Sequence, residues 1–196
     1  MDYSLLHRRE SLILTTIEVL DELGIQGLST REIARRQGVS EATIFRHYKT
    51  KNDLLLAMLD YNSMYDSDII ASIRIKKLGL RAAITYFISS FAEYYENYPA
   101  ITAISLACDV LASDPLLEAK IKDSFSTRIG FIKELIAENQ NSARINQNLD
   151  SEKISYLIWG SFMTICVNWR FKKYNFSLKE YTLSTLNMTL DAFQIN

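Results

Sequence analysis

The scarcity of glycine and proline is the feature that most constrains how this chain can fold. Its 196 residues contain 6 glycines and 2 prolines, whereas average usage would give roughly 14 and 10. Turn-rich sheet proteins, collagen-like chains and disordered linkers all use more of these residues. Because 48% of the residues are apolar and 11% aromatic, the chain can bury a substantial core. The composition therefore predicts an all-α protein with long helices and few breaks.

Residues 1–50 are predicted to form the first of two domains, built from three short helices. Apolar side chains recur at steps of three and four over residues 5–23, which predicts an amphipathic helix that stops at Gly24. Ser29 and Glu32 then have the spacing of a capping box, in which each side chain bonds the backbone amide of the other residue. A second helix is therefore expected to start at this box.

A tight turn and a third helix are predicted to follow. Gly38 suits the left-handed backbone position that ends a helix at Gln37, and Ser40 is placed to cap a helix over residues 41–48. Ala34 is small at the point where the two helices would cross closely. Two short helices joined by a glycine turn have the dimensions of a helix-turn-helix motif.

The second domain, residues 51–196, is predicted to be a single helical bundle, which brings the total to about nine helices. A box-like start at residues 50–53 opens a long fourth helix that runs to about residue 74. Pro99 and Pro115 each suit the first turn of a later helix. The other helices are predicted over residues 84–98, 151–173 and 178–194, and the polar run 138–148 is the best loop candidate.

Positive charge is concentrated in the helix-turn-helix segment, although the formal net charge of the chain is only −1. Bulk basicity therefore cannot supply nucleic-acid affinity, and local clustering must do so. Two anions, Glu32 and Glu41, stand among six cations over residues 31–51. The six are Arg31, Arg35, Arg36, Arg46, Lys49 and Lys51.

One side of the third helix is predicted to face base edges, because Ile44 and Tyr48 would turn the opposite side toward the core. A carboxylate such as Glu41 accepts a hydrogen bond from cytosine, and Arg46 suits either guanine or phosphate. The alternative is that these are ordinary solvated side chains on a short helix. The residues on the predicted reading side are Glu41, Ala42, Thr43, Arg46 and His47.

Three segments carry a recognisable family pattern: Leu28-Ser29-Thr30-Arg31-Glu32-Ile33-Ala34, Gly38-Val39-Ser40 and Thr43-Ile44-Phe45-Arg46-His47-Tyr48-Lys49-Thr50-Lys51. They resemble the tetracycline-repressor (TetR) family of bacterial transcription regulators over about the first 55 to 60 residues. The resemblance implies that phosphates are held by Thr30, Arg31, His47 and Lys51, and that bases are approached by Glu41, Ala42, Thr43 and Arg46. Phe45 stands where the family often has tyrosine, so one hydroxyl contact to phosphate is expected to be absent.

The segment 154–169 is apolar on every side, so a helix there needs two sets of neighbours. One set is its own domain, and the other is predicted to be the same helix of a second subunit, because Gly160 and Ser161 permit close approach. The predicted homodimer interface comprises Leu157, Gly160 and Ser161 with Leu183, Leu186 and Leu190 of the last helix. An entirely intramolecular core is the alternative.

Aromatic residues of the second domain are predicted to line an apolar ligand cavity between helices, with tyrosine hydroxyls orienting the guest. The alternative is that they are simply core. The TetR resemblance implies that this region takes small-molecule inducers. The residues are Tyr61, Tyr65, Phe87, Phe91, Tyr94, Tyr95 and Trp159.

Neither catalysis nor a cofactor is indicated by any motif. The chain has no GxSxG, HExxH, phosphate-loop or GxGxxG pattern. His7 is the only histidine besides His47, and no acid lies at ligand spacing from His47, so no metal site is predicted. The chain is therefore expected not to be an enzyme and to need no cofactor.

A cytoplasmic location is predicted. Cys108 and Cys166 are too few and too far apart for a disulfide framework, and the first twenty residues lack the apolar run of a secretory signal. The longest uncharged stretch, residues 154–169, would span about 24 Å as a helix, less than the roughly 30 Å of a membrane core. No membrane association is expected.

These features together predict a sequence-specific DNA-binding transcriptional regulator. The favoured interpretation is a repressor that binds a palindromic operator as a homodimer and is released by a small apolar or aromatic ligand. Two symmetry-related reading helices would contact both halves of the palindrome, since one short helix buries too little groove to be specific. The alternative is a DNA-tethered helical module that binds another protein and has no small-molecule effector.

Overall fold

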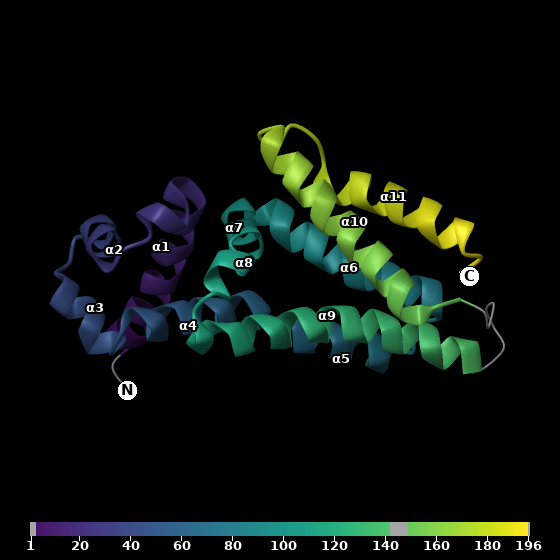
Figure 1. Ribbon diagram of the computed structural model, residues 1–196, viewed down its shortest axis with the longest axis horizontal. Helices are drawn as coiled ribbons and strands as arrows, with labels where there is room; N and C mark the ends of the chain where they lie inside the picture. The colour runs from purple at the N-terminus through teal and green to yellow at the C-terminus, as the bar shows by residue number, and fades with distance from the viewer. Residues whose placement is uncertain (1–2, 142–148, 196) are drawn as a thin grey trace. The chain divides into compact units, whose positions relative to one another are not determined.

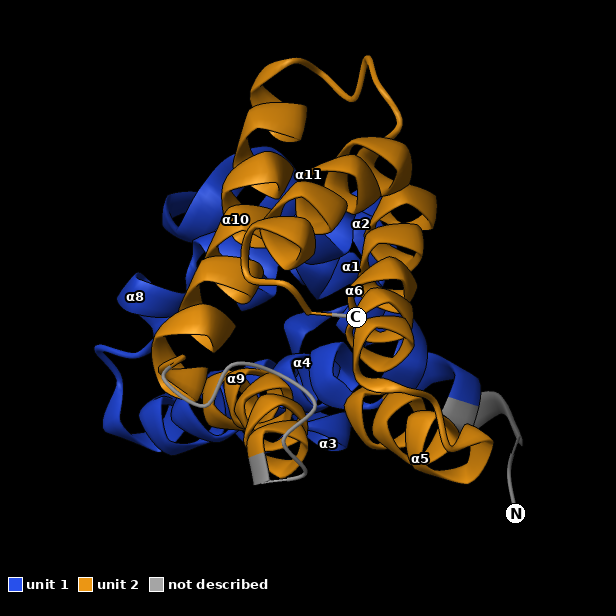
Figure 2. Ribbon diagram, turned by 90° about the vertical axis from the view of Figure 1, so that its right-hand side faces the viewer, with its two compact units in different colours: residues 1–64, 99–123 blue, residues 65–98, 124–196 orange. Residues whose placement is uncertain are grey.

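A computed structural model describes residues 3–141 and 149–195, and within these ranges the chain is helical and contains no strand (Figure 1). The prediction of an all-α protein with an N-terminal helix-turn-helix region and a C-terminal bundle is confirmed. Residues 142–148 of the predicted loop lie outside the described residues. The chain divides into an N-terminal unit, residues 1–64 and 99–123, and a C-terminal unit, residues 65–98 and 124–196 (Figure 2).

The N-terminal unit is built around α1, which packs against α2, α4 and α7. Its interior is formed by completely or almost completely buried side chains that include Leu12, Ile17, Ile33, Ile44 and Met58. The elements of this unit are α1 (Tyr3–Gly27), α2 (Thr30–Gln37), α3 (Glu41–His47), α4 (Lys51–Ser63), the 3-10 helix η1 (Pro99–Ile101), α7 (Thr102–Leu106), α8 (Cys108–Leu111) and the first part of α9 (Pro115–Asn141).

Local signals placed most helix ends in this unit correctly. The backbone leaves the helical region at Gly24, where φ is 64°, and α2 ends at Gly38, where φ is 63°. The Ser40 side chain accepts a hydrogen bond from the Thr43 amide, and Thr50 and Asp53 form a reciprocal capping box at the start of α4. These residues fix helix ends through bonds within four residues, which is why the sequence alone reveals them.

The capping box predicted at the start of α2 is only half formed. The Ser29 hydroxyl accepts a hydrogen bond from the Glu32 amide at 3.2 Å, as expected. The Glu32 carboxylate instead accepts hydrogen bonds from Arg35 and Arg36. Two guanidinium groups one turn further along the helix attract this carboxylate more strongly than the neutral Ser29 amide does.

The C-terminal unit is organised around α6, which packs against α5 and α11, while α10 also packs against α11. Its core contains a cluster of aromatic side chains, Phe87, Phe91, Tyr95, Trp159 and Phe162. The elements of this unit are α5 (Asp66–Lys76), α6 (Leu80–Asn97), the second part of α9, α10 (Ser151–Phe171) and α11 (Leu178–Ala192).

The long fourth helix predicted to reach residue 74 is wrong. α4 ends at Ser63 and α5 begins at Asp66. The Ser63 hydroxyl donates to carbonyls of its own helix, at Leu59 and Asp60, and Asp66 is held by a distant arginine, Arg128. Within the described residues, the break and the short helices after Pro99 add elements that the prediction of about nine helices did not include, and helix α9 continues through Asn141 into the predicted loop. The domain division at residue 50 stays a prediction.

Candidate nucleic-acid interface and ligand groove

The helix-turn-helix, residues 29–51, is called the head below. Contacts beneath α2 and α3 hold it together. Ile33, Ala34 and Ile44 are buried, and the hydroxyl of buried Tyr48 donates a hydrogen bond to the Arg9 carbonyl at 3.0 Å. The Arg9 guanidinium lies 4.9 Å from the centre of the Tyr48 ring, which adds a cation–π contact. These contacts hold α3 in place, with its outer surface facing solvent.

The cations of this head fall into two groups. Glu32 accepts hydrogen bonds from Arg35 at 2.7 and 2.8 Å and from Arg36 at 2.9 Å, and Arg36 also contacts Glu22 at 2.8 Å. The bonds from Arg35 and Arg36 lower the pKa of Glu32 to about 2. These two arginines are therefore partly neutralised within the head and serve its structure.

A second group of cations remains available for phosphates. Arg31, Arg46 and Lys49 are exposed, and within the described residues none of them forms an ion pair. Lys51 is exposed as well, and its ammonium donates to the Leu28 carbonyl at 2.6 Å without losing its charge. Positive charge is thus retained where the resemblance implies phosphate contacts.

The structure places the predicted reading residues on the surface of this head. Glu41, Ala42 and Arg46 are exposed, whereas Thr43 and His47 are half-buried. Thr30 is also half-buried, and its hydroxyl donates a hydrogen bond to Glu41 Oε2 at 2.6 Å. Thr30 and Glu41, for which the resemblance implies separate DNA contacts, are therefore bonded to each other.

His47 sits in an unusual electrostatic setting. Its Nε2 atom is buried and has no hydrogen-bond partner among the described residues. Burial, together with the charges of Arg46, Arg9 and Arg8, lowers the pKa of the imidazole below its usual value of 6.5. The ring is therefore neutral at pH 7, which suits a single hydrogen bond better than an ion pair with phosphate.

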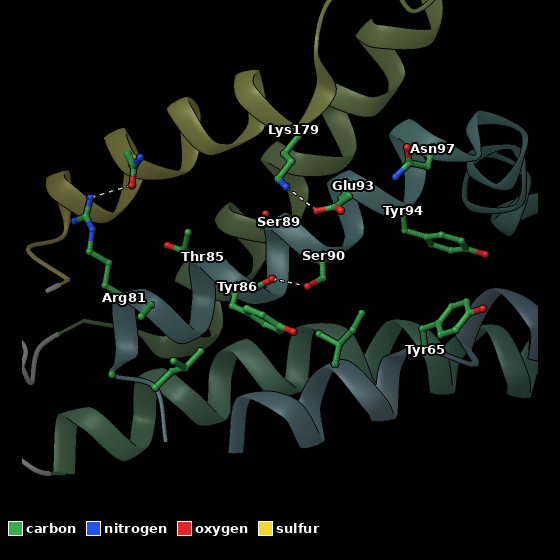
Figure 3. Close-up of a pocket in the computed structure, with 15 residues that line it drawn as sticks. Tyr65, Arg81, Thr85, Tyr86, Ser89, Ser90, Glu93, Tyr94, Asn97 and Lys179 are labelled. Atoms are coloured by element: carbon green, nitrogen blue, oxygen red, sulfur yellow. Dashed lines mark hydrogen bonds and ion pairs between the residues drawn. The ribbon is translucent and has the colours of Figure 1, made fainter. Parts of the chain in front are cut away.

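A groove of about 1250 Å³ runs along α6 in the C-terminal unit, with α5 on one side and α11 on the other (Figure 3). Its floor consists largely of small side chains, among them Ala82, Thr85, Ser89 and Ser90, which leave room above the helix. Figure 3 shows Thr85 and Ser89 between the side chains of Arg81 and Lys179.

The groove has polar edges and an aromatic end. Lys179 Nζ lies 2.6 Å from Glu93 Oε2, and Arg81 bonds Asp191 on α11 at 2.7 Å. The rings of Tyr65 and Tyr94 meet edge to face, with their centres 5.5 Å apart. This combination of apolar interior and charged rim suits an amphipathic guest.

The residues predicted to bind a ligand lie in different surroundings, and their role stays a prediction. Tyr65 and Tyr94 line the groove, and Tyr61 belongs to the N-terminal unit. The other four, Phe87, Phe91, Tyr95 and Trp159, are buried and contact one another as core. The sequence reasoning missed the small residues of α6, whose helical spacing was the one available signal.

The predicted dimer residues also separate. Leu157 and Gly160 are exposed on α10, while Ser161 and Leu183 are half-buried. Leu186 and Leu190 are 3% and 0% exposed within their own unit, so they have almost no surface left for a partner. Large apolar side chains do remain exposed on α10 and α11, namely Tyr156, Leu157, Phe171, Tyr181 and Met188.

No group of three or more His, Cys, Asp or Glu side chains that could hold a metal ion is found among the residues described. In that same part of the chain, no helix is both long enough and apolar enough to cross a membrane.

The fold and the cationic head define a helix-turn-helix DNA-binding protein. Comparison with known protein families identifies the family of helix-turn-helix proteins to which the chain belongs. The chain belongs to the tetR family of bacterial regulatory proteins: the sequence model of that family matches residues 12–58, and the model of the YsiA-like protein C-terminal region matches residues 69–192. The resemblance seen in the sequence is thereby confirmed.

Individual relatives agree with this assignment. The class C tetracycline repressor of Escherichia coli is 40% identical over 53 residues, which span 27% of this chain and 24% of that protein. The match to the repressors thus covers about a quarter of their length. The fatty acid metabolism regulator of Bacillus subtilis is 22% identical over 186 residues, 92% of this chain and 93% of that protein.

Solved structures share the fold along nearly the whole chain. The regulator FadR from Bacillus subtilis, solved in complex with stearoyl-CoA, has a TM-score of 0.79 at 19% identity and covers 92% of this chain and 96% of that chain. FadR from Bacillus halodurans has a TM-score of 0.78 at 19% identity, with coverage of 92% and 97%. The prediction of a DNA-binding transcriptional regulator is confirmed at the level of the family, whose members are described as bacterial regulatory proteins.

Proposed function

We propose that the chain is a ligand-responsive transcriptional repressor that binds a palindromic operator as a homodimer. The observation that carries this proposal is the head itself. Its rigidly supported α3 presents Arg46, while Arg31 and Lys49 remain outside any ion pair among the described residues. Local cation clustering of this kind supplies the phosphate attraction that a chain of net charge −1 otherwise lacks.

In the proposed complex, α3 lies in the major groove. Arg31, His47 and Lys51 contact phosphates on either side of that groove and fix the register of the head. Glu41, Ala42, Thr43 and Arg46 face base edges. Arg46 has the chemistry to bind guanine through two hydrogen bonds, and the methyl groups of Ala42 and Thr43 suit thymine.

The homodimer is proposed to form through the exposed faces of α10 and α11. Leu157 is 53% exposed, Phe171 82% and Met188 71%, an unusual amount of apolar surface for adjacent helices of one unit. Gly160 on α10 has no side chain, so a helix of the second subunit could approach α10 closely at that point. A twofold pair of heads then explains why the operator is proposed to be palindromic.

The effector is proposed to lie in the groove on α6. The chain-long similarity to a regulator solved with stearoyl-CoA supports a ligand with a long apolar part and an anionic head. The small residues of the floor would accommodate the apolar part, and Arg81 or Lys179 at the rim would face the anionic head. Binding would favour a state of the dimer whose two heads no longer fit the operator.

Selection of bound duplexes from random DNA tests the proposal with the full chain. We expect a palindromic consensus, a dimer by light scattering, and release of the operator by stearoyl-CoA but not by coenzyme A alone. Equal binding to the consensus and to a scrambled duplex at the same salt concentration would overturn it. Retained DNA binding with no response to any acyl ligand would remove only the effector part.

A further inference from the structure

We propose that Thr30 is a positioning residue for Glu41, and that the carboxylate held in this way reads the exocyclic amino group of a cytosine or an adenine. The inference rests on the proposed operator binding. It assigns Thr30 a role different from the phosphate contact that the TetR resemblance implies.

The contact that carries the inference joins the first residues of two helices. Thr30 opens α2 and Glu41 opens α3. The Thr30 hydroxyl donates a hydrogen bond of 2.6 Å to Glu41 Oε2, a length typical of a hydroxyl bonded to a charged carboxylate. The backbone of each residue is also held in place, because Ser29 caps α2, which begins at Thr30, and Ser40 caps α3, which begins at Glu41.

The stoichiometry of this bond excludes two simultaneous roles for Thr30. A hydroxyl group has one proton to donate, and a phosphate oxygen has none to offer in return. While Thr30 donates to Glu41, it therefore cannot also donate to a DNA phosphate. The structure thus presents a choice between holding Glu41 and holding the DNA backbone.

The hydrogen bond from Thr30 has a larger effect on Glu41 than it would have on a DNA phosphate. Its side chain is exposed, and a free glutamate samples many rotamers, so restricting it to one of them costs conformational entropy. A carboxylate near DNA is also repelled by phosphates, so an unrestrained side chain would turn toward solvent. With Oε2 bound by Thr30, the chain is held near α3 and Oε1 remains able to accept a further hydrogen bond.

The chemistry of a fixed carboxylate selects among the four bases. In the major groove, cytosine and adenine present amino donors, whereas guanine and thymine present acceptors at the corresponding positions. A carboxylate attracts the first pair and repels the second. Thr30 and Glu41 would therefore act together as a filter for an amino group at one position of each half-site, with cytosine the expected base.

Four single variants of the full chain, and the double variant that combines Thr30→Val with Glu41→Ala, test this pairing by selection from random duplexes followed by affinity measurements. Thr30→Val keeps the shape but removes the proton donor, and Thr30→Ser keeps the donor. Glu41→Gln and Glu41→Ala identify the position that Glu41 reads. Thermal unfolding confirms that each variant is folded.

We expect Glu41→Gln to change the preferred base at a single half-site position and Glu41→Ala to abolish the preference there. Thr30→Val should reduce the preference at that same position from about tenfold or more to below about threefold, and Thr30→Ser should retain it. In the Glu41→Ala background, Thr30→Val should have no further effect on that position.

Other outcomes overturn the inference. If Thr30→Val weakens binding to all sequences equally and leaves every preference intact, Thr30 is a phosphate contact. If no position responds to Glu41→Gln and Glu41→Ala, or if the affected position prefers guanine or thymine, Glu41 does not read an amino group. A wild-type chain without any sequence preference would instead overturn the proposed operator binding, and this inference with it.

Discussion

Arg128 binds Asp66 through two hydrogen bonds inside the C-terminal unit, with Nε 2.8 Å from Oδ2 and Nη2 3.1 Å from Oδ1. Both side chains are 6% exposed. The guanidinium also lies over the rings of Phe91, at 5.0 Å, and Trp159, at 5.7 Å. This pair joins the first residue of α5 to α9 next to the aromatic core.

Removing one member of the pair should destabilise the C-terminal unit strongly. Asp66→Leu leaves a buried guanidinium without its carboxylate, and such losses cost about 3–5 kcal/mol. The double variant Asp66→Leu with Arg128→Met should recover much of this, because two apolar groups need no partner. Urea unfolding measures both changes.

The exposed pair Arg74–Glu134 provides the control. Its side chains are 61% and 48% exposed, so Arg74→Ala should cost less than about 1 kcal/mol. If Asp66→Leu cost no more than this control, or if the double variant were less stable than both single variants, the pair would not have the role assigned to it.

The same pair shows where prediction from sequence ends. Gly38, Ser40 and Thr50 mark helix ends through hydrogen bonds to nearby residues. The helix ends of the helix-turn-helix could therefore be predicted from the sequence. The break between α4 and α5 involves Asp66 and a partner 62 residues away, and no periodicity reveals such a contact. The groove could not be predicted either, because it is formed by three helices that pack together only in the folded chain. The aromatic residues gave no guide, since their spacing is the same whether they line a cavity or fill a core.

Arg46→Ala should weaken operator binding, because Arg46 is exposed on α3 and is in no ion pair within the described residues. If Arg46 reads guanine, the preference at one position per half-site should relax by roughly 1–3 kcal/mol. Arg35→Ala is the matched control, since Arg35 is already bound to Glu32. An unchanged affinity and footprint for Arg46→Ala would place that residue outside the interface.

Ser161→Glu and Leu157→Glu should each convert dimers to monomers. Both residues lie on α10 beside Gly160, and a carboxylate buried between two identical helices would face its own symmetry mate. Ser126→Glu, on the exposed surface of α9, is the control and should leave the oligomeric state unchanged. Analytical ultracentrifugation separates the outcomes, and a dimer of normal stability in both α10 variants would refute the assigned face.

His47 should make the stability of the head depend on pH. Burial and three nearby arginines lower the pKa of the imidazole in the folded state, so the unfolded chain binds the proton more readily. Stability should therefore fall as the pH drops through about 6.5 toward the lower folded pKa, and the loss should level off below it. His47→Gln removes this component. Melting temperatures of the two proteins should diverge between pH 7.5 and 5, and parallel curves would contradict the assignment.

Filling the groove should abolish the response to the effector without disturbing DNA binding. Ala82 is exposed on the groove floor, so Ala82→Trp adds an indole where the apolar part of a guest would lie and displaces no core side chain. We expect this variant to bind the selected operator as tightly as the wild-type chain and to remain bound when stearoyl-CoA is added. Ala119→Trp, an exposed alanine of α9 outside the groove, should respond as the wild-type chain does. Release of both variants by stearoyl-CoA would show that the ligand binds elsewhere, and the buried aromatic cluster around Phe91 and Trp159 would then become the site to test.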